Sequence, residues 1–430
     1  MESFIYQMTF IVTFVSISIL AIRKSMQVAS TDDFAVAGRT LNAPGVSWII
    51  IGTLVGGVST IGTVQTAYTH GISAAIFTFG SGVSCFLLGC FFAKALREEG
   101  VVTVSEYLGK FFGRNFRYYS SAINSLGMFI HVVGQFLASI AILQAVFALG
   151  DTLSVLLTML LIGIFVISGG IAGAGLIGKI KFFMLYLIMI ISAGVALYNG
   201  GGLPKILSQL PQDIDMLGFA DYGIKTATVD MFSMIVGVLS TQIYLQAIFS
   251  ARNIREARNG AFLSAVIIPP IGVFGIVVGL YLRANHPEIS ANPAQALPYF
   301  LHQCFPPVIA ALFSAGILLV VLGTGAGLVL GVTTNLFHDF LQGRAGMLQR
   351  IRPIRLIRMS TCAVLVLASM LVFTGLDSTI LKWSYMSMGL RGSTVFAGLF
   401  IVIFFKRFAE SKVLLMLLYC LPILYVLLNI

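Results

Sequence analysis

Several side chains that could bind a solute or an ion lie inside long apolar runs of this sequence. Thr53, Ser59 and Gln65 surround the pair Gly56-Gly57 in one such run. Hydroxyl and amide groups are costly in lipid unless they face a cavity or a partner. The glycines fit close helix packing. They also fit a helix that is broken at mid-membrane, whose freed backbone groups bind a solute or a cation. The polar neighbours favour the broken helix.

A second group of polar side chains lies along the apolar run 118–149. Asn124, His131 and Gln135 are seven and four residues apart. At about 100° per residue, these spacings place them within about 40° of each other on a helix. Such a stripe either hydrogen-bonds to neighbouring helices or lines a cavity, and both interpretations stay open. His131 alone as a proton carrier is a weaker hypothesis.

Arg391 lies near the centre of the apolar run 379–405. A central arginine costs roughly 2.5–3.5 kcal/mol of insertion free energy, so it must pair with a partner or face water. Asp377 is too far along the chain to be an obvious partner. Two candidates remain: a substrate carboxylate held by the bidentate guanidinium, or backbone carbonyls of a broken neighbouring helix.

The composition shows that lipid surrounds these runs. Apolar residues make up 58% of the 430 residues, charged residues 10%, and the mean hydropathy is +0.98, whereas soluble domains carry about 25% charge. The net charge of +10 does not indicate nucleic acid, because Lys and Arg fall in short clusters between the runs. No phosphate-binding loop, HExxH or GxSxG motif occurs, and the five cysteines lack metal-ligand spacing. We predict a protein that is not an enzyme.

Roughly 20 apolar residues cross a bilayer core about 30 Å thick. On this length the sequence predicts an all-α polytopic membrane protein, one domain over 1–430, with about twelve transmembrane helices. The predicted spans are 3–22, 45–69, 73–95, 118–149, 152–172, 176–199, 229–250, 261–283, 306–336, 357–376, 379–405 and 411–430. The segment 200–228 is the best candidate for an irregular external segment.

Basic residues gather on one side of the predicted bundle. With Met1 outside, Lys or Arg lies in or beside every inner connection, whereas the outer connections hold only Lys205, Lys225 and Arg283. Cytoplasmic loops are the basic ones. We therefore predict a plasma (inner) membrane protein with both termini outside. The inner connections are 23–44, 96–117, 173–181, 251–260, 337–356 and 406–412.

From about residue 30 to residue 407 the chain resembles the sodium/solute symporter family. The resemblance rests on the ordered series DDFAVAGRTL, VGGVSTIGTVQTAYTHGI, TVSEYLGKFFGRNFR, GGIAGAGLIGKIK, TQIYLQAIFSARNIREARNGA and GTGAGLVLGVTTNLFHDF. It implies the leucine-transporter-type fold of two inverted five-helix repeats, 45–199 and 229–405, with peripheral helices in 1–44 and 411–430. The predicted topology agrees, because five spans per repeat invert the second copy.

The resemblance implies one sodium site, with ligands from Gly52, Val55, Val320, Gly323 and Thr324. Thr324 keeps a hydroxyl, but Gly323 stands where a hydroxyl residue is common. A hard cation takes roughly five or six oxygens by analogy with other oxygen-ligated ions, so the site is weakened by Gly323. At the family's second cation position this sequence has Gly178, which offers no side-chain oxygen. A second sodium ion is therefore not expected.

The same placement implies a polar solute cavity at the membrane midplane. Its expected lining is Thr53, Gly56, Ser59, Gln65, His131, Gln135, Ser240, Thr241, Gln242 and Arg391. This lining suits a small organic solute, and Arg391 makes a carboxylate one candidate. The expected partners are that solute and the lipid bilayer, with no nucleic acid; the sequence does not determine the oligomeric state.

The leading hypothesis for function is sodium-coupled symport of the solute by alternating access. One alternative keeps the fold but removes the sodium, as a uniporter or a proton-coupled symporter. Another is a membrane protein that binds solute without accumulating it. Uptake that rises at low pH without sodium would favour the sodium-independent transporter. Solute binding without uphill accumulation would favour the non-accumulating membrane protein.

Overall fold

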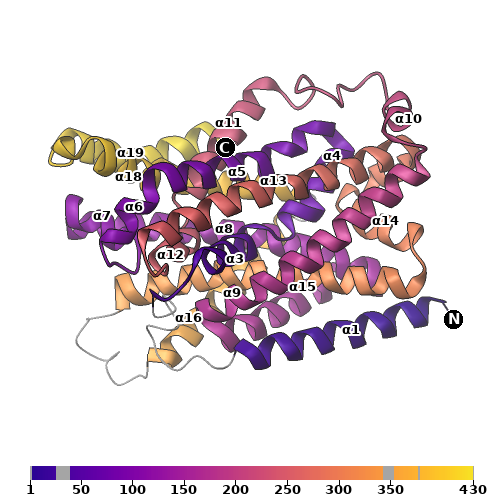
Figure 1. The fold of residues 1–430 in the computed structure, drawn as a ribbon, viewed down its shortest axis with the longest axis horizontal. Coiled ribbons are helices and arrows are strands. Elements are labelled where there is room, and N and C mark those ends of the chain that lie inside the picture. Colours follow the sequence, from indigo (N-terminus) through magenta and orange to yellow (C-terminus); the bar gives the residue numbers. More distant parts are fainter. Residues whose placement is uncertain (1, 26–38, 342–352, 376–377, 430) are drawn as a thin grey trace.

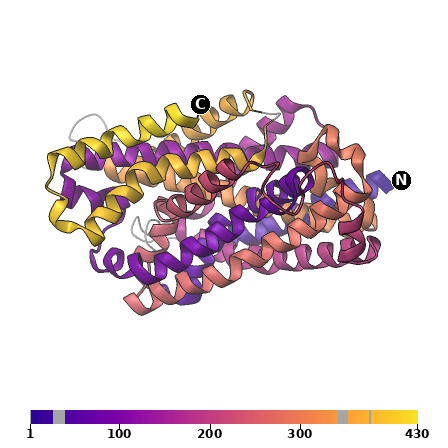
Figure 2. The same cartoon turned by 90° about the horizontal axis from the view of Figure 1, so that it is seen from above.

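The computed structural model describes residues 2–25, 39–341, 353–375 and 378–429, and this part of the chain is almost entirely helical (Figures 1 and 2). Among these residues, seven helical segments are long and apolar enough to cross a membrane, and further apolar helices are shorter. The all-α membrane fold is confirmed; the count of twelve spans stays a prediction. Asp377 and the basic segments 26–38 and 342–352 lie outside the described residues.

The helices of the first half follow the predicted spans. They are α1 (Glu2–Ser25), α3 (Ala43–Leu54), η2 (Val58–Gly62), α4 (Thr63–His70), η3 (Gly71–Ala74), α5 (Ala75–Leu87), η4 (Leu88–Phe92), α6 (Ala93–Glu98), α7 (Val104–Phe112), α8 (Arg114–Phe147) and α9 (Asp151–Asn199). Asn42 begins α3, where its side chain accepts from the Gly45 amide at 3.0 Å, because the first amides of a helix lack intrahelical partners.

The helices of the second half also contain the predicted spans. They are α10 (Leu203–Ser208), α11 (Ile224–Val238), α12 (Gln242–Phe249), α13 (Ile254–Asn285), η5 (Pro287–Ala291), η6 (Pro293–Gln295), α14 (Ala296–Cys304), α15 (Pro307–Asn335), η7 (Leu336–Leu341), α16 (Pro353–Val372), α17 (Ile380–Arg391), η9 (Gly392–Phe396), α18 (Ala397–Phe404), η10 (Lys406–Phe408) and α19 (Lys412–Asn429). Apart from α10, the segment 200–223 is turns and bends, as predicted.

Two predicted spans, 152–172 and 176–199, lie within the single helical run α9. This run cannot be straight. Ile162 packs against Gly325 of α15, and Lys181 hydrogen-bonds to the adjacent Thr324, whereas 19 residues of straight helix would separate Ile162 and Lys181 by about 28 Å. The run therefore bends between them, and its division into two antiparallel spans stays a prediction.

The segments predicted for the two sides of the membrane separate to opposite ends of the bundle (Figure 1). One end carries α7, η7 and the junction of α12 with α13, all predicted to be inside; we call it the α7 end. The other carries the N-terminus, α10 and α14, all predicted to be outside; we call it the vestibule end. The two groups are separated as the basic-residue count predicts, and which end faces the cytoplasm stays a prediction.

Candidate functional site

Helix α3 breaks in the interior of the bundle, as the polar residues around its glycines predict. The helix ends at Leu54, Val55 is extended at φ −90° and ψ 107°, and the chain resumes at Val58 as the π-helical turn η2. The freed Gly56 amide donates to Ser59 Oγ at 2.8 Å. Ser59 therefore stabilises the break itself.

Glycine at the break lets neighbouring helices come into contact with it. A Cβ on Gly56 would lie 2.4 Å from Thr324 Oγ1 of α15, and a Cβ on Gly57 would lie 2.4 Å from the Ala138 side chain of α8. Real Cβ atoms do not approach other atoms so closely. Close packing and a broken helix are therefore two consequences of the same glycines.

The predicted cation ligands converge beside this break. Thr324 Oγ1 lies 3.1 Å from the carbonyl oxygens of Val55 and Val320, and 3.4 Å from that of Gly52. Gly323 is buried next to Thr324 and contributes no side-chain oxygen. Carbonyl and hydroxyl oxygens are the ligands that hard cations take, so the chemistry of this set fits a sodium ion.

A lysine side chain also enters this set, which the sequence did not predict. Lys181 of α9 is only 2% exposed. Its Nζ donates to the Gly52 carbonyl and, at 2.7 Å, to Thr324 Oγ1. The predicted topology assigned Lys181 to the inner connection 173–181, because a lysine beside a chain reversal resembles any other basic loop residue. The structure instead places this side chain in the interior of the bundle.

Gly178 explains how Lys181 reaches the break in α3. A Cβ at position 178 would lie 2.0 Å from the Trp48 carbonyl oxygen and 3.2 Å from Gly52 Cα. Helices approach so closely only through small residues. One turn further along α9, Lys181 therefore lies beside Gly52. A glycine at 178 followed by a lysine three residues later is the sequence signal for this contact.

The polar stripe of α8 hydrogen-bonds to neighbouring segments, which is one of its two predicted roles, and lining a cavity stays a prediction. All three side chains are fully buried, and each contacts a different helix: Asn124 Nδ2 donates to the Ser240 carbonyl at 2.9 Å, His131 Nε2 lies 3.2 Å from Ser384 Oγ, and Gln135 Oε1 accepts from the Gly57 amide at 2.9 Å. The second polar atom of each, Asn124 Oδ1, His131 Nδ1 and Gln135 Nε2, has no hydrogen-bond partner within the described chain. One side-chain atom holds the helices together and the other stays free.

A second interruption separates α11 from α12 at Leu239–Thr241, which the sequence did not predict because no glycine pair marks it. Ser240 Oγ and Thr241 Oγ1 both donate to the Gly237 carbonyl, at 3.0 and 2.6 Å. The first helix of each predicted repeat is therefore interrupted. Thr53 likewise donates back to its own helix, at the Ile49 carbonyl.

The Gln242 side chain forms both of its hydrogen bonds with the backbone at the start of α7. Its side-chain oxygen accepts from the Val104 amide and its nitrogen donates to the Val102 carbonyl, both at 2.9 Å. In this conformation Gln242 therefore connects α12 to the start of α7.

Arg391 is the most unusual predicted residue in its surroundings. It is 0% exposed, and its Nη2 donates to the Met388 sulfur at 2.9 Å. Its Nε and Nη1 have no partner in the part of the chain that the structure describes. A Cβ on Gly127 of α8 would lie 2.3 Å from Arg391 Cγ, so the side chain packs tightly. No backbone carbonyl of the described residues accepts from the guanidinium, which removes one of the two predicted pairings.

Two other buried side chains with an unpartnered polar atom interact electrostatically with Arg391. They are His131 and Tyr244, whose Nδ1 and hydroxyl have no partner among the described residues. Burying unpartnered polar atoms costs about 1–3 kcal/mol each. These atoms are therefore candidates for contact with a ligand.

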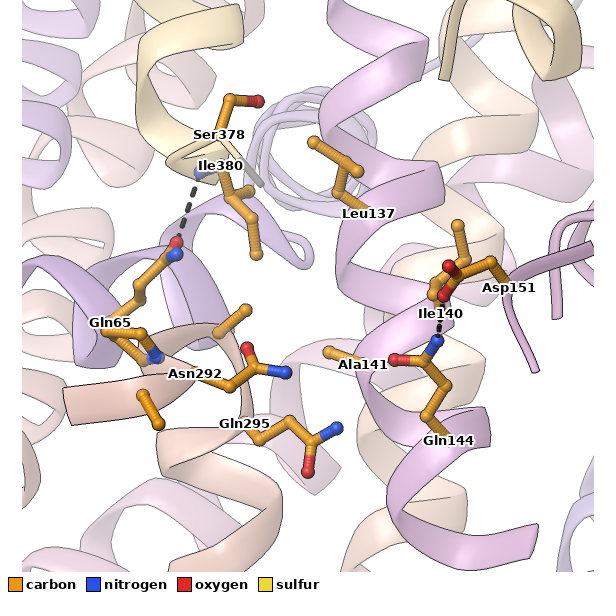
Figure 3. A pocket seen from close by; sticks show the side chains of 13 residues that line it. Gln65, Leu137, Ile140, Ala141, Gln144, Asp151, Asn292, Gln295, Ser378 and Ile380 are labelled. Atoms are coloured by element: carbon orange, nitrogen blue, oxygen red, sulfur yellow. Dashed lines mark hydrogen bonds between the residues drawn. The ribbon is translucent and has the colours of Figure 1, made fainter. Parts of the chain in front are cut away.

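A cavity of about 240 Å³ lies at the vestibule end (Figure 3). Figure 3 shows Gln65, Asn292 and Gln295 on one side of it and Gln144 with Asp151 on the other. Gln65 Oε1 accepts from the Ile380 amide at 3.1 Å. The predicted solute residue Gln65 therefore lines this cavity and also hydrogen-bonds to the start of α17.

A buried carboxylate joins three segments at the α7 end. Asp339 accepts from Arg117 Nε at 2.9 Å, from Thr103 Oγ1 at 3.1 Å and from Ser121 Oγ at 2.8 Å. These bonds join η7 to α8 and to the start of α7. The vestibule end thus carries a polar cavity, and the α7 end carries a buried hydrogen-bond network.

Residues 34–418 match the description "Sodium:solute symporter family". This match covers most of the chain, and the protein belongs to that family. The fold agrees: a solved structure described as the substrate-bound outward-open state of a Na⁺-coupled sialic acid symporter has a TM-score of 0.79, with 15% identity over 98% of this chain and 96% of that one.

The curated relatives are transporters. The high-affinity choline transporter 1 of Caenorhabditis elegans is 24% identical over 56% of this chain and 42% of its own length. The sodium-coupled monocarboxylate transporter 2 of Bos taurus is 22% identical over 74% of this chain and 54% of its own. The chain spans about half the length of the curated relatives it matches.

Proposed function

We propose that this protein is a secondary active transporter that moves a small organic solute through the plasma membrane together with sodium. The observation that carries the proposal is the convergence of Gly52, Val55, Val320 and Thr324 at the break in α3. A broken helix at the interface of two repeats is where such transporters bind their ions and substrates. Membership of the sodium:solute symporter family supports sodium as the ion.

The asymmetry of the two ends supports alternating access as the mechanism. The polar cavity at the vestibule end admits solute, while the Asp339 contacts close the α7 end. Rocking of one bundle against the other would break the Asp339 and Gln242 contacts and close the cavity. We propose that the two inverted repeats, 45–199 and 229–405, provide the helices that move against each other. Helices α1 and α19 would lie at the periphery.

The proposed solute carries a carboxylate. Arg391 is fully buried with free N–H groups, and a carboxylate that accepts from them forms a charge-assisted hydrogen bond. His131, Gln135 and Tyr244 contribute further unpartnered polar atoms to the same interior. Among the relatives, the monocarboxylate transporter fits this chemistry and the choline transporter does not. Arg391 therefore supports a carboxylate as the solute.

The test uses the purified full chain in sealed proteoliposomes with an imposed sodium gradient. Radiolabelled short monocarboxylates are compared with their primary amides, which keep the shape and lose the charge. We expect uphill uptake of at least one carboxylate only when sodium is outside in excess, and no uptake of its amide. Equal uptake of acid and amide would contradict the role of Arg391. Equal uptake with and without the gradient would contradict sodium coupling.

A further inference from the structure

The chain provides its own cation at the predicted sodium position. The Lys181 ammonium donates to the Gly52 carbonyl and Thr324 Oγ1, two of the atoms that would hold sodium. Thr324 Oγ1 in turn lies 3.1 Å from the other two carbonyls, of Val55 and Val320. A sodium ion and a lysine ammonium carry the same single charge and take the same oxygens. They cannot both occupy this position.

The end of helix α3 favours a cation of either kind. The last carbonyls of a helix have no intrahelical partner and form the negative end of its dipole. Gly52 supplies such a carbonyl, because the Gly56 amide that would reach it in a continuous helix donates to Ser59 instead. Neither α3 nor α15 contains an ionisable side chain along its described length. Helix-end carbonyls and the Thr324 hydroxyl, rather than a carboxylate, would therefore stabilise the bound cation.

The missing hydroxyl at position 323 fits an ammonium better than a metal ion. An ammonium has three N–H donors, and two of them are used here. A hard metal ion needs more oxygens around it than that. The substitution that weakens the site for sodium leaves it adequate for Lys181.

We propose that Lys181 is a tethered competitor of sodium: its ammonium occupies the sodium position between α3, α9 and α15, and sodium binds only by displacing it. The described conformation is the lysine-bound form. This inference rests on the proposed function in taking the site as the coupling site. In the transport cycle, Lys181 would leave as sodium and solute bind. It would return after their release, so that the carrier reorients with one positive charge at the break.

The competition predicts a specific effect of removing the ammonium. The apparent dissociation constant of a ligand is its intrinsic value divided by the fraction of protein that is competent to bind. If Lys181 leaves the position for about a tenth of the time, sodium binds about tenfold more weakly than to a protein without this ammonium.

The experiment is binding of radioactive sodium to the detergent-solubilised full chain. Wild type is compared with Lys181→Met, Lys181→Gln and the control Lys179→Met, which removes the same group from an exposed position two residues away. We expect about tenfold tighter sodium binding in both Lys181 variants, no change in Lys179→Met, and loss of the gain in Lys181→Met combined with Thr324→Ala. Thermal melting verifies that each variant is folded; Lys181→Gln retains a donor for the Gly52 carbonyl.

Two outcomes would overturn the proposal. Folded Lys181 variants that bind sodium no more tightly than wild type would show that the ammonium does not compete. Folded variants that lose sodium binding would show that Lys181 supports the ion. Sodium binding that appears only in the Lys181 variants would support the competition while contradicting sodium coupling in the wild type. Absence of solute uptake in a protein that shows the competition would contradict the transport function alone.

Discussion

Among the residues whose burial the structure describes, the lysine and arginine side chains that are buried are Lys181 and Arg391, and they are satisfied in opposite ways. Lys181 reaches the carbonyl end of a broken helix and a hydroxyl. Arg391 reaches a methionine sulfur, with two of its nitrogens left without a partner among the described residues. A buried charge is stable when it is hydrogen-bonded and costly when it is not. We therefore propose that the first is a resident ligand of its site and that the second marks a site whose ligand comes from outside.

The strongest test of this comparison is Arg391→Met. We expect carboxylate uptake to fall by about 30-fold or more, because removing one partner of a buried charge pair costs roughly 2 kcal/mol or more. The melting temperature without solute should stay the same or rise, because an unsatisfied buried charge is removed. Initial uptake rates and thermal melting measure the two effects. A large loss of stability would instead assign Arg391 a structural role.

The next test asks whether Lys181 protects its site from sodium. Sodium at about 100 times its dissociation constant stabilises a folded protein by about 2.7 kcal/mol. We expect a sodium-dependent rise of melting temperature in Lys181→Met at concentrations that leave the wild type unchanged, with potassium as the control. If sodium raised the melting temperature equally in the two proteins, Lys181 would not compete with sodium for the site.

Gly178→Ala moves Lys181 away from the break in α3 without changing the lysine itself. The new Cβ would lie 2.0 Å from the Trp48 carbonyl oxygen, and overpacking costs about 1–3 kcal/mol. We expect a lower melting temperature and weaker contact of Lys181 with the break, seen as tighter sodium binding in the folded fraction. The matched control on α9 is Gly194→Ala, whose Cβ would meet nothing within 4 Å. Equal melting temperatures for the two variants would contradict the close approach of α9 to α3.

Thr324→Ala should have the smallest effect, because it removes a partner that sodium and Lys181 share. One hydrogen bond to a charged group contributes about 1.5–3 kcal/mol, but the loss weakens both competitors. We expect the apparent sodium requirement for uptake to rise several-fold at most in the wild-type background. It should rise more in Lys181→Met, where only sodium uses the hydroxyl. Sodium titrations of uptake measure both, and equal shifts in the two backgrounds would mean that Lys181 and sodium do not share Thr324.

Much of the cation site was accessible from sequence. Gly56-Gly57 among hydroxyl residues predicted the break in α3, and the family resemblance placed Gly52, Val55, Val320 and Thr324 together, as the structure does. The second break, at Leu239–Thr241, was missed because Ser240 and Thr241 stabilise it through their own back-bonds to Gly237 rather than through a glycine pair.

Lys181 shows where reasoning from the linear sequence failed. Counting basic residues per connection assigns every lysine near a chain reversal to the aqueous side. That rule describes an average over loops, and Lys179 follows it by being exposed. Lys181 departs from it because a glycine contact brings α9 against α3. No periodicity in the sequence reports how closely two helices approach.

The sequence by itself determined that the chain lies in lipid, that it is helical, which segments share an end of the bundle, and which family it belongs to. These properties follow from sums over neighbouring residues: hydropathy, charge and the order of motifs. Only the tertiary structure decided which buried cation is satisfied and which is not. Lys181 and the Gly52 carbonyl are 129 residues apart in sequence, and their contact depends on the packing of α9 against α3, to which hydropathy, charge and motif order contribute no direct information.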